Sequence, residues 1–253
     1  MLNSLPKFWM FLLIPLLGFI NPGPLPSDNF LKGAWGLVEV NGEEVGRQAQ
    51  TVRIFSNTYT MATTYDQENK TFISSRGGPY SLEGKKVSLT IDYHTIDTAQ
   101  VGQTYSYKIS INADDILTVK GANPAGEKIN QKWRRLDNGD APLAGAWQIT
   151  QRMGRDGAMR EITPGVRKTV KILSGTRFQW TAMNTETKEF LGCGGGAYTF
   201  ENGVYTENIE FFSRDSSRVG MSLSFEGKVE GDDWHHSGKS SLGRPIQEVW
   251  SRD

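Results

Sequence analysis

The sequence predicts an all-β protein in which an N-terminal signal segment precedes two small antiparallel β-barrels in tandem. First, residues 51–83 align without a gap on residues 169–201, and thirteen of these 33 positions are identical. Second, apolar and polar residues alternate with a period of two in each copy, as in half-buried strands. Third, turn residues recur at the spacing of about 8 to 12 residues that is typical of sandwiches and barrels. Closure into a barrel would remove the exposed strand edges.

The ends of the repeat define the expected domains. Residues 31–35 match residues 143–147, and Trp-x-Arg recurs near the end of each copy. The polar stretch between the copies contains turn residues and marks a boundary. The expected divisions are a signal peptide or anchor (1–22), a linker (23–30), a first barrel (31–137), a second linker (138–142) and a second barrel (143–253).

The N-terminal segment has the pattern of a secretory signal. Phe8–Ile20 is a run of thirteen residues without a charge. It is shorter than the roughly 20 apolar residues that a membrane-spanning helix needs, and Pro15 interrupts it. We therefore expect export from the cell, with membrane contact only through this segment if it remains uncleaved.

Composition excludes several classes of protein. The chain has 253 residues, of which 37% are hydrophobic and 22% charged, and this excludes bulk disorder. The 28 Lys and Arg balance the 28 Asp and Glu, so no basic surface for nucleic acid is expected. Cys193 is the single cysteine, which excludes an intrachain disulfide framework, and no disulfide partner is expected.

A family resemblance follows from motifs at both ends of each copy. Gly-x-Trp on the first strand (Gly33/Trp35 and Gly145/Trp147) with an Arg on the last strand resembles the lipocalin superfamily, in which that Trp and Arg pack at the closed end of the barrel. The candidate arginines are Arg134 or Arg135 in the first copy and Arg252 in the second.

The second copy as a whole resembles the lipocalin-like domains of unknown function in exported Bacteroidetes proteins. The segments that carry this likeness are Phe178-Gln179-Trp180, Gly194–Tyr198, Tyr205-Thr206-Glu207 and Trp234–Gly238. The resemblance implies a small barrel and an envelope location, and no known activity. Together with the N-terminal segment, it leads us to expect a periplasmic or secreted protein of a bacterium.

Glu207 is the first candidate for a site. The aligned residue in the first copy is Leu89, so this carboxylate is specific to the second copy. The alternation places Glu207 on an inward face with Tyr205, Ile209 and Phe211, where an unpaired carboxylate would cost several kcal/mol. The expected partners are Lys168, on the face of Val166, Val170 and Ile172, and Arg177. Glu207 is then either a structural ion-pair partner or a ligand-facing acid.

His236 is the second candidate. It shares a strand face with Trp234 and is expected to point inward, while His235 points outward. Two interpretations of His236 remain open: it is either a structural histidine, hydrogen-bonded within the barrel, or a residue that contacts a ligand. No HxH or HExxH spacing is present, so we expect neither a metal nor a cofactor.

The expected function is binding of a small, partly apolar ligand in the second barrel. Trp180, Phe178 and Tyr198 would form apolar walls, and the polar groups would orient the ligand. The candidate ligand-binding residues are Glu207, Trp180, Phe178, Tyr198, His236, Lys168 and Arg177. No catalytic residue is assigned. One alternative is a barrel enzyme in which Glu207 or His236 acts as general base in an isomerase- or hydratase-like proton transfer. The other is a non-enzymatic interaction protein of the cell envelope.

One register conflict points to contact between the barrels. The apolar face of one strand in the first copy is Tyr59 and Met61, whereas the apolar residues Phe178 and Trp180 align with Thr60 and Ala62. Both rows are interior only if the strand is also covered from outside. We therefore expect Tyr59 and Met61 to contact the other barrel.

Overall fold

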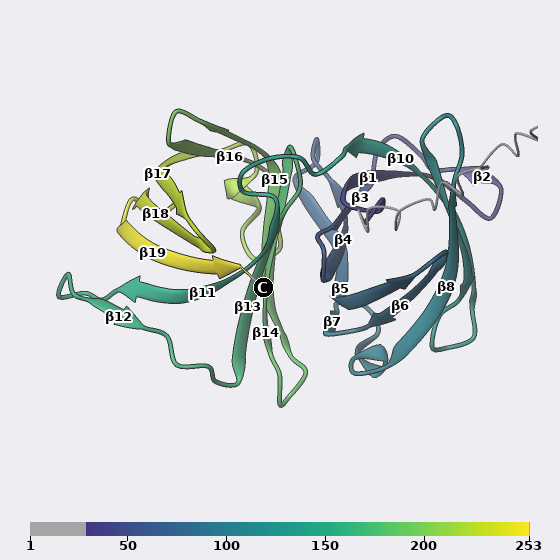
Figure 1. Cartoon of the computed structure of the whole chain (residues 1–253), viewed down its shortest axis with the longest axis horizontal. Coiled ribbons are helices and arrows are strands. Elements are labelled where there is room, and N and C mark those ends of the chain that lie inside the picture. Colours follow the sequence, from purple (N-terminus) through teal and green to yellow (C-terminus); the bar gives the residue numbers. More distant parts are fainter. Residues whose placement is uncertain (1–28, 253) are drawn as a thin grey trace, which may run out of the picture.

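A computed structural model describes residues 29–252, so the expected signal segment and most of the first linker lie outside the described residues. The first half of the chain forms ten strands and one 3-10 helix (Figure 1). These are β1 (Gly33–Val40), β2 (Glu43–Glu44), β3 (Gln50–Phe55), β4 (Tyr59–Asp66), β5 (Thr71–Glu83), β6 (Lys86–Thr90), β7 (Tyr93–His94), η1 (Thr98–Gln100), β8 (Thr104–Ile111), β9 (Ile116–Ala122) and β10 (Lys128–Asp137).

The second half repeats this arrangement with nine strands. These are β11 (Gly145–Met153), β12 (Met159–Glu161), β13 (Arg167–Leu173), β14 (Arg177–Asn184), β15 (Phe190–Glu201), β16 (Val204–Phe212), η2 (Ser216–Arg218), β17 (Ser222–Glu230), β18 (Asp233–Lys239) and β19 (Pro245–Arg252). Among the described residues, no helix is long and apolar enough to cross a membrane.

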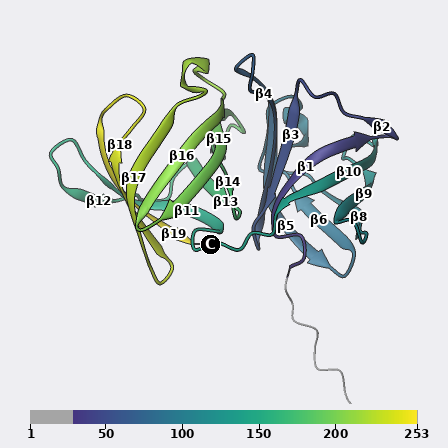
Figure 2. The ribbon, with the colours of Figure 1, turned by 90° about the horizontal axis from the view of Figure 1, so that it is seen from above.

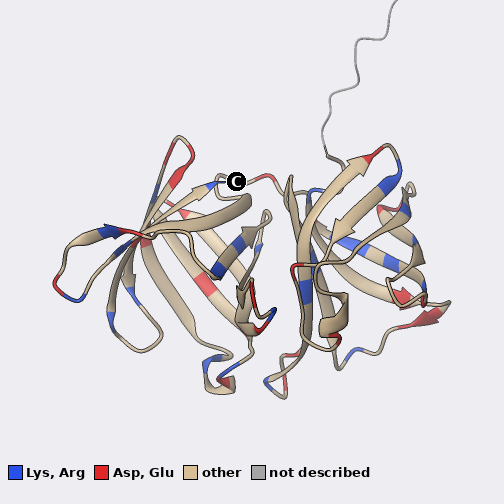
Figure 3. Cartoon of the chain, turned by 90° about the horizontal axis from the view of Figure 1, so that it is seen from below, with Lys and Arg blue, Asp and Glu red and all other residues tan. Residues whose placement is uncertain are grey.

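Each sheet closes on itself. In the first, β10 pairs with β1 after the order β1-β3-β4-β5-β6-β8-β9-β10. In the second, β19 pairs with β11 after the order β11-β13-β14-β15-β16-β17-β18-β19. All of these pairs are antiparallel, so the prediction of two closed barrels in tandem is confirmed. Acidic and basic residues are distributed over both barrels (Figure 3).

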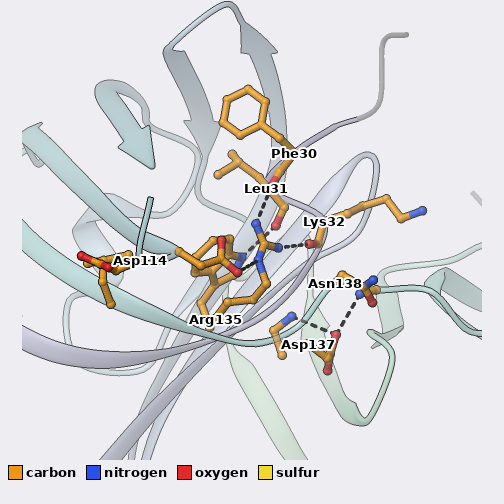
Figure 4. A network of polar contacts seen from close by, with 12 residues as sticks. Phe30, Leu31, Lys32, Asp114, Arg135, Asp137 and Asn138 are labelled. Atoms are coloured by element: carbon orange, nitrogen blue, oxygen red, sulfur yellow. Dashed lines mark hydrogen bonds and ion pairs between the residues drawn. The ribbon is translucent and has the colours of Figure 1, made fainter. Parts of the chain in front are cut away.

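One end of each barrel is closed by a tryptophan and an arginine. Arg135 lies 4.0 Å from the ring centroid of Trp35 and donates hydrogen bonds to the carbonyls of Lys32 and Phe30 (Figure 4). Arg252 lies 4.4 Å from the ring centroid of Trp147 in the second barrel. The packing that the resemblance implies is therefore present, and Arg135 rather than Arg134 performs it in the first copy.

The two barrels pack directly against each other, side by side (Figure 2). Strand β13 contacts β3 and β4, β14 contacts β3, and β16 contacts β5. Tyr59 and Met61 are 3% and 1% exposed and lie in one apolar cluster with Val170, Ile172 and Met183 of the second barrel. The predicted role of Tyr59 and Met61 is confirmed, and the register is the same in both copies.

Polar contacts also cross between the barrels. The Gln179 amide donates to the Val52 carbonyl at 3.1 Å. At the end of β10, the Asp137 carboxylate accepts hydrogen bonds from the backbone N–H groups of Gly175 and Thr176 in the β13–β14 turn. Because Asp137 belongs to the first barrel and the turn to the second, this carboxylate ties the two barrels together beside the linker.

Candidate functional site

The lumen of the second barrel is aromatic and contains a buried ion pair. Its core cluster includes Trp147, Phe178, Tyr198, Tyr205, Phe225, Trp234 and Trp250, with Trp180 packed against it. Within it, the Lys171 ammonium and the Glu207 carboxylate lie 2.5 Å apart, and both residues are buried. Glu207 points inward as predicted, but its partner is Lys171.

The expected partner Lys168 points the other way, and this prediction is wrong. Val170 and Ile172, on the same face of β13 as Lys168, pack against the first barrel, and Val166 is exposed. Lys168 pairs with Asp92 of the first barrel at 2.7 Å. Both faces of β13 are covered, one by the lumen and one by the neighbouring barrel, so the apolar residues beside Lys168 mark the contact with the first barrel and not the lumen.

Arg177 is also outside the lumen, which corrects the second expected partner. It pairs with Glu210 at 2.6 Å, and the Tyr65 hydroxyl of the first barrel donates to the same carboxylate. Phe211 contacts the Tyr65 ring at 4.8 Å between centroids rather than facing the lumen. The register of β15 against β16 shifts at Glu210, and this bulge reverses the alternation beyond it.

Four aromatic rings surround the Lys171 ammonium. The ring centroids of Phe178, Tyr205, Trp234 and Trp250 lie 4.9 to 5.6 Å from its nitrogen. The Tyr205 hydroxyl also donates to Glu207 at 3.0 Å. Burial, together with the Glu207 charge, raises the pKa of Tyr205 well above its usual value, so it stays a donor. Because Glu207 already accepts from two donors, its environment is that of a structural ion pair.

His236 and the Trp234 indole are buried polar groups of this lumen whose hydrogen bonds are not made within the described residues. His236 is 4% exposed, and neither of its ring nitrogens makes a hydrogen bond there. Its ring centroid lies 4.2 Å from that of Phe225 and 5.1 Å from that of Trp234. Burial lowers the pKa of His236, so the imidazole is neutral at pH 7. Its inward orientation is as predicted.

Glu248 on the neighbouring strand lies beside this imidazole. Its carboxylate lies 3.7 Å from His236 Nδ1, beyond hydrogen-bond distance, and it accepts from the Trp250 indole and from Arg152. Burial opposes ionisation, but the His236 ring, Arg152 and Trp250 lower the pKa of Glu248 to about 2. A carboxylate on this side favours the proton on Nδ1, which leaves Nε2 as a lone-pair acceptor.

Of the other expected residues, Phe178 and Tyr198 belong to the packed lumen. The Tyr198 hydroxyl donates to the Ser174 carbonyl at 2.6 Å. Trp180 is half-buried and its ring contacts Phe212 at 5.5 Å between centroids. Five of the seven expected residues therefore share the lumen, and Lys168 and Arg177 do not.

A hollow of about 660 Å³ lies over β16 to β19 and the β11–β12 hairpin. His236 and Glu248 border it, as do side chains of the outward strand faces such as Glu226, Lys228 and His235. Apolar surface comes from Met159, Val204 and Val249. Of the seven residues expected from the sequence, His236 alone borders this hollow.

Three residues of the site were missed in the sequence: Lys171, Glu248 and Arg152. Lys171 alternates with Val170 and Ile172 and could have been placed on the inner face by period two. Glu248 shares a face with Trp250, but the Arg152 position depends on a bulge between Ile149 and Gln151, which the sequence does not mark.

Other groups do not suggest chemistry of their own. Cys193 is buried, and burial raises the pKa of its thiol to about 12, so it is protonated. No group of three or more His, Cys, Asp or Glu among residues 29–252 could hold a metal ion.

No known family model matches the sequence, and no curated protein is significantly similar to it. Among solved structures, a lipocalin-like protein from Bacteroides uniformis aligns with 45% of this chain and 100% of its own, at 11% identity and a TM-score of 0.32. An uncharacterized protein from Saccharomyces cerevisiae aligns with 85% of this chain and 97% of its own, at 10% identity and a TM-score of 0.47. Transferrin Binding Protein B from Haemophilus parasuis aligns with 80% of this chain and 60% of its own, at 9% identity and a TM-score of 0.23. The fold of this chain is shown by its own strand pairings, which close each sheet into a barrel.

Proposed function

We infer that the protein binds a small, partly apolar molecule in its second barrel, against His236. The observation that carries this inference is the buried, neutral imidazole whose Nε2 makes no hydrogen bond among the described residues. Buried polar groups are nearly always hydrogen-bonded, and an unmade bond costs about 1–3 kcal/mol. A ligand that supplies the missing partner would recover this free energy.

The ligand chemistry follows from the surroundings of the imidazole. Nε2 accepts a hydrogen bond, so the ligand carries a hydroxyl or N–H donor. Phe225 and Trp234 flank the ring and favour apolar ligand surface beside that donor. The hollow of about 660 Å³ borders His236, and its volume lies in the range of small-molecule sites.

Substitution of His236 by Phe tests this function, because Phe keeps the ring and removes both nitrogens. Native mass spectrometry of protein purified from its own host should show a bound molecule on the wild type and its loss from the His236→Phe variant. His235→Phe is the matched control, since His235 borders the same hollow but is exposed and points outward. The inference fails if the wild type carries no molecule, or if the ligand is lost from the His235 variant and kept by the His236 variant.

We further propose that the chain is exported from a bacterial cell. The uncharged run Phe8–Ile20 supports this location. A fusion of residues 1–30 to a reporter that is active only outside the cytoplasm should be active. An inactive fusion, with the reporter retained in the cytoplasm, would contradict export.

A further inference from the structure

One row of side chains crosses the lumen of the first barrel from β1 to β7. Strand pairing aligns its five members in order: Trp35, Arg53, Ala62, Arg76 and His94. Residues directly opposite each other in antiparallel strands point to the same face of a sheet. Since Trp35 belongs to the lumen core, the whole row faces the lumen.

The same row in the second barrel is mostly aromatic. Its members are Trp147, Lys171, Trp180, Gly194 and Phe212. There Trp180 occupies the space over Gly194 and reaches the Phe212 ring. In the first barrel the large side chain has moved to the next strand, as Arg76 beside Ala62, and His94 stands in place of the phenylalanine.

This exchange leaves the first lumen with two guanidinium groups. Arg53 is 3% exposed; it donates to the Tyr107 hydroxyl at 3.3 Å and lies 5.0 Å from the Trp133 ring centroid, but its Nε has no partner. Arg76 forms no hydrogen bond or ion pair with any residue of the part of the chain that the structure describes. Both cations therefore lack a carboxylate there.

In the second barrel, the cation of this row has a counter-ion. Lys171, which aligns with Arg53, is neutralised by Glu207. The position of Glu207 is Leu89 in the first barrel, and Leu89 belongs to the apolar core. Arg53 is buried and Arg76 half-buried, and two like charges so placed without a counter-ion are unfavourable, because desolvation and mutual repulsion add. Burial and the nearby Arg53 lower the pKa of Arg76 accordingly.

His94 adds a third donor to this row. Its Nδ1 accepts hydrogen bonds from the backbone N–H groups of Ile96 and Asp97, at 3.2 and 3.0 Å. The proton of the neutral ring is therefore on Nε2, and burial, with Arg76 beside it, lowers the pKa of His94 and keeps the ring neutral. The row presents two guanidinium groups and an imidazole N–H, and this is a set of donors for an anion.

We propose that the lumen of the first barrel binds the oxyanion group of a small molecule, a carboxylate or a phosphate, between Arg53, Arg76 and His94. The remaining walls of this lumen include Leu89, Leu117 and Trp133, which are apolar and buried. The ligand is therefore amphiphilic, with its charged group on the row and its apolar part along these walls. This site is separate from the one proposed at His236, so either can fail without the other.

Isothermal titration calorimetry on the full-length chain tests this site with three probes. Octanoate carries the oxyanion and an apolar tail, inorganic phosphate carries an oxyanion alone, and octanol carries the tail alone. We expect octanoate to bind more tightly than octanol, and phosphate to compete with octanoate if the row accepts both oxyanions.

The variants for this experiment remove one cation at a time. Arg76→Met should weaken octanoate binding about tenfold or more, the effect of one lost charge-assisted hydrogen bond, and should leave octanol binding unchanged. Arg134→Met is the matched control because Arg134 is exposed on β10, and it should bind octanoate like the wild type. If Arg76→Met does not fold, Arg76→Lys keeps the charge, loses the bidentate geometry and should still weaken binding.

Three results would overturn the proposal. They are no binding of octanoate or phosphate to the wild type, equal octanoate affinity in the wild type and the Arg76 variant, and equal affinity for octanoate and octanol. Competition by phosphate extends the site to phosphate groups, and binding of octanoate without such competition assigns it to carboxylates.

Discussion

At the scale of single residues, the Lys171–Glu207 pair is expected to stabilise the fold. Glu207→Gln would leave the Lys171 ammonium, 6% exposed, without its counter-charge. Removal of one partner of a buried pair costs about 3–5 kcal/mol, so the free energy of unfolding should fall by about that amount, as measured by urea denaturation. The double variant Lys171→Met/Glu207→Leu should recover most of the loss, since neither charge remains. An unchanged free energy for Glu207→Gln would assign Glu207 to a ligand instead.

At the scale of strands, the sequence predicts well which residues share one face of a strand. It predicts less well whether that face points into the lumen or away from it. The inward positions of Glu207 and His236 follow from period two. Lys168 was misplaced because β13 is covered on both sides, so its apolar residues mark the contact with the other barrel. Phe211 was misplaced because the Glu210 bulge depends on pairing with β15, and pairing is not a property of one strand's sequence.

The glycines of β15 allow this strand to lie close to its neighbours, and this gives a prediction. A Cβ at Gly195 would lie 2.6 Å from the Phe211 ring and 2.5 Å from the Phe178 carbonyl. Gly195→Ala should therefore lower the free energy of unfolding by about 1–3 kcal/mol through overpacking. Gly46→Ala is the control, since nothing lies within 4 Å of the added Cβ, and it should change stability little. Equal effects of the two substitutions, measured by thermal denaturation, would contradict the packing of β15.

At the scale of the whole molecule, the repeat predicts two barrels, and the register conflict at Tyr59 and Met61 predicts where they meet. The polar contacts of that interface were not predictable, because residues such as Gln179 and Val52 lie 127 positions apart and neither follows a pattern. The interface is apolar at its centre and hydrogen-bonded around it, so we expect the two barrels to unfold as one cooperative unit.

Substitution of Met61 by Asp should separate the barrels. Met61 is 1% exposed in the apolar cluster between them, and an unpaired carboxylate there costs several kcal/mol. The barrels would avoid that cost by parting, since Met61 points away from its own lumen. Differential scanning calorimetry should show one unfolding transition for the wild type and two for Met61→Asp. Ser106→Asp, at an exposed position of β8, should keep the single transition. One transition at an unchanged midpoint in the Met61 variant would mean that the barrels do not depend on this contact.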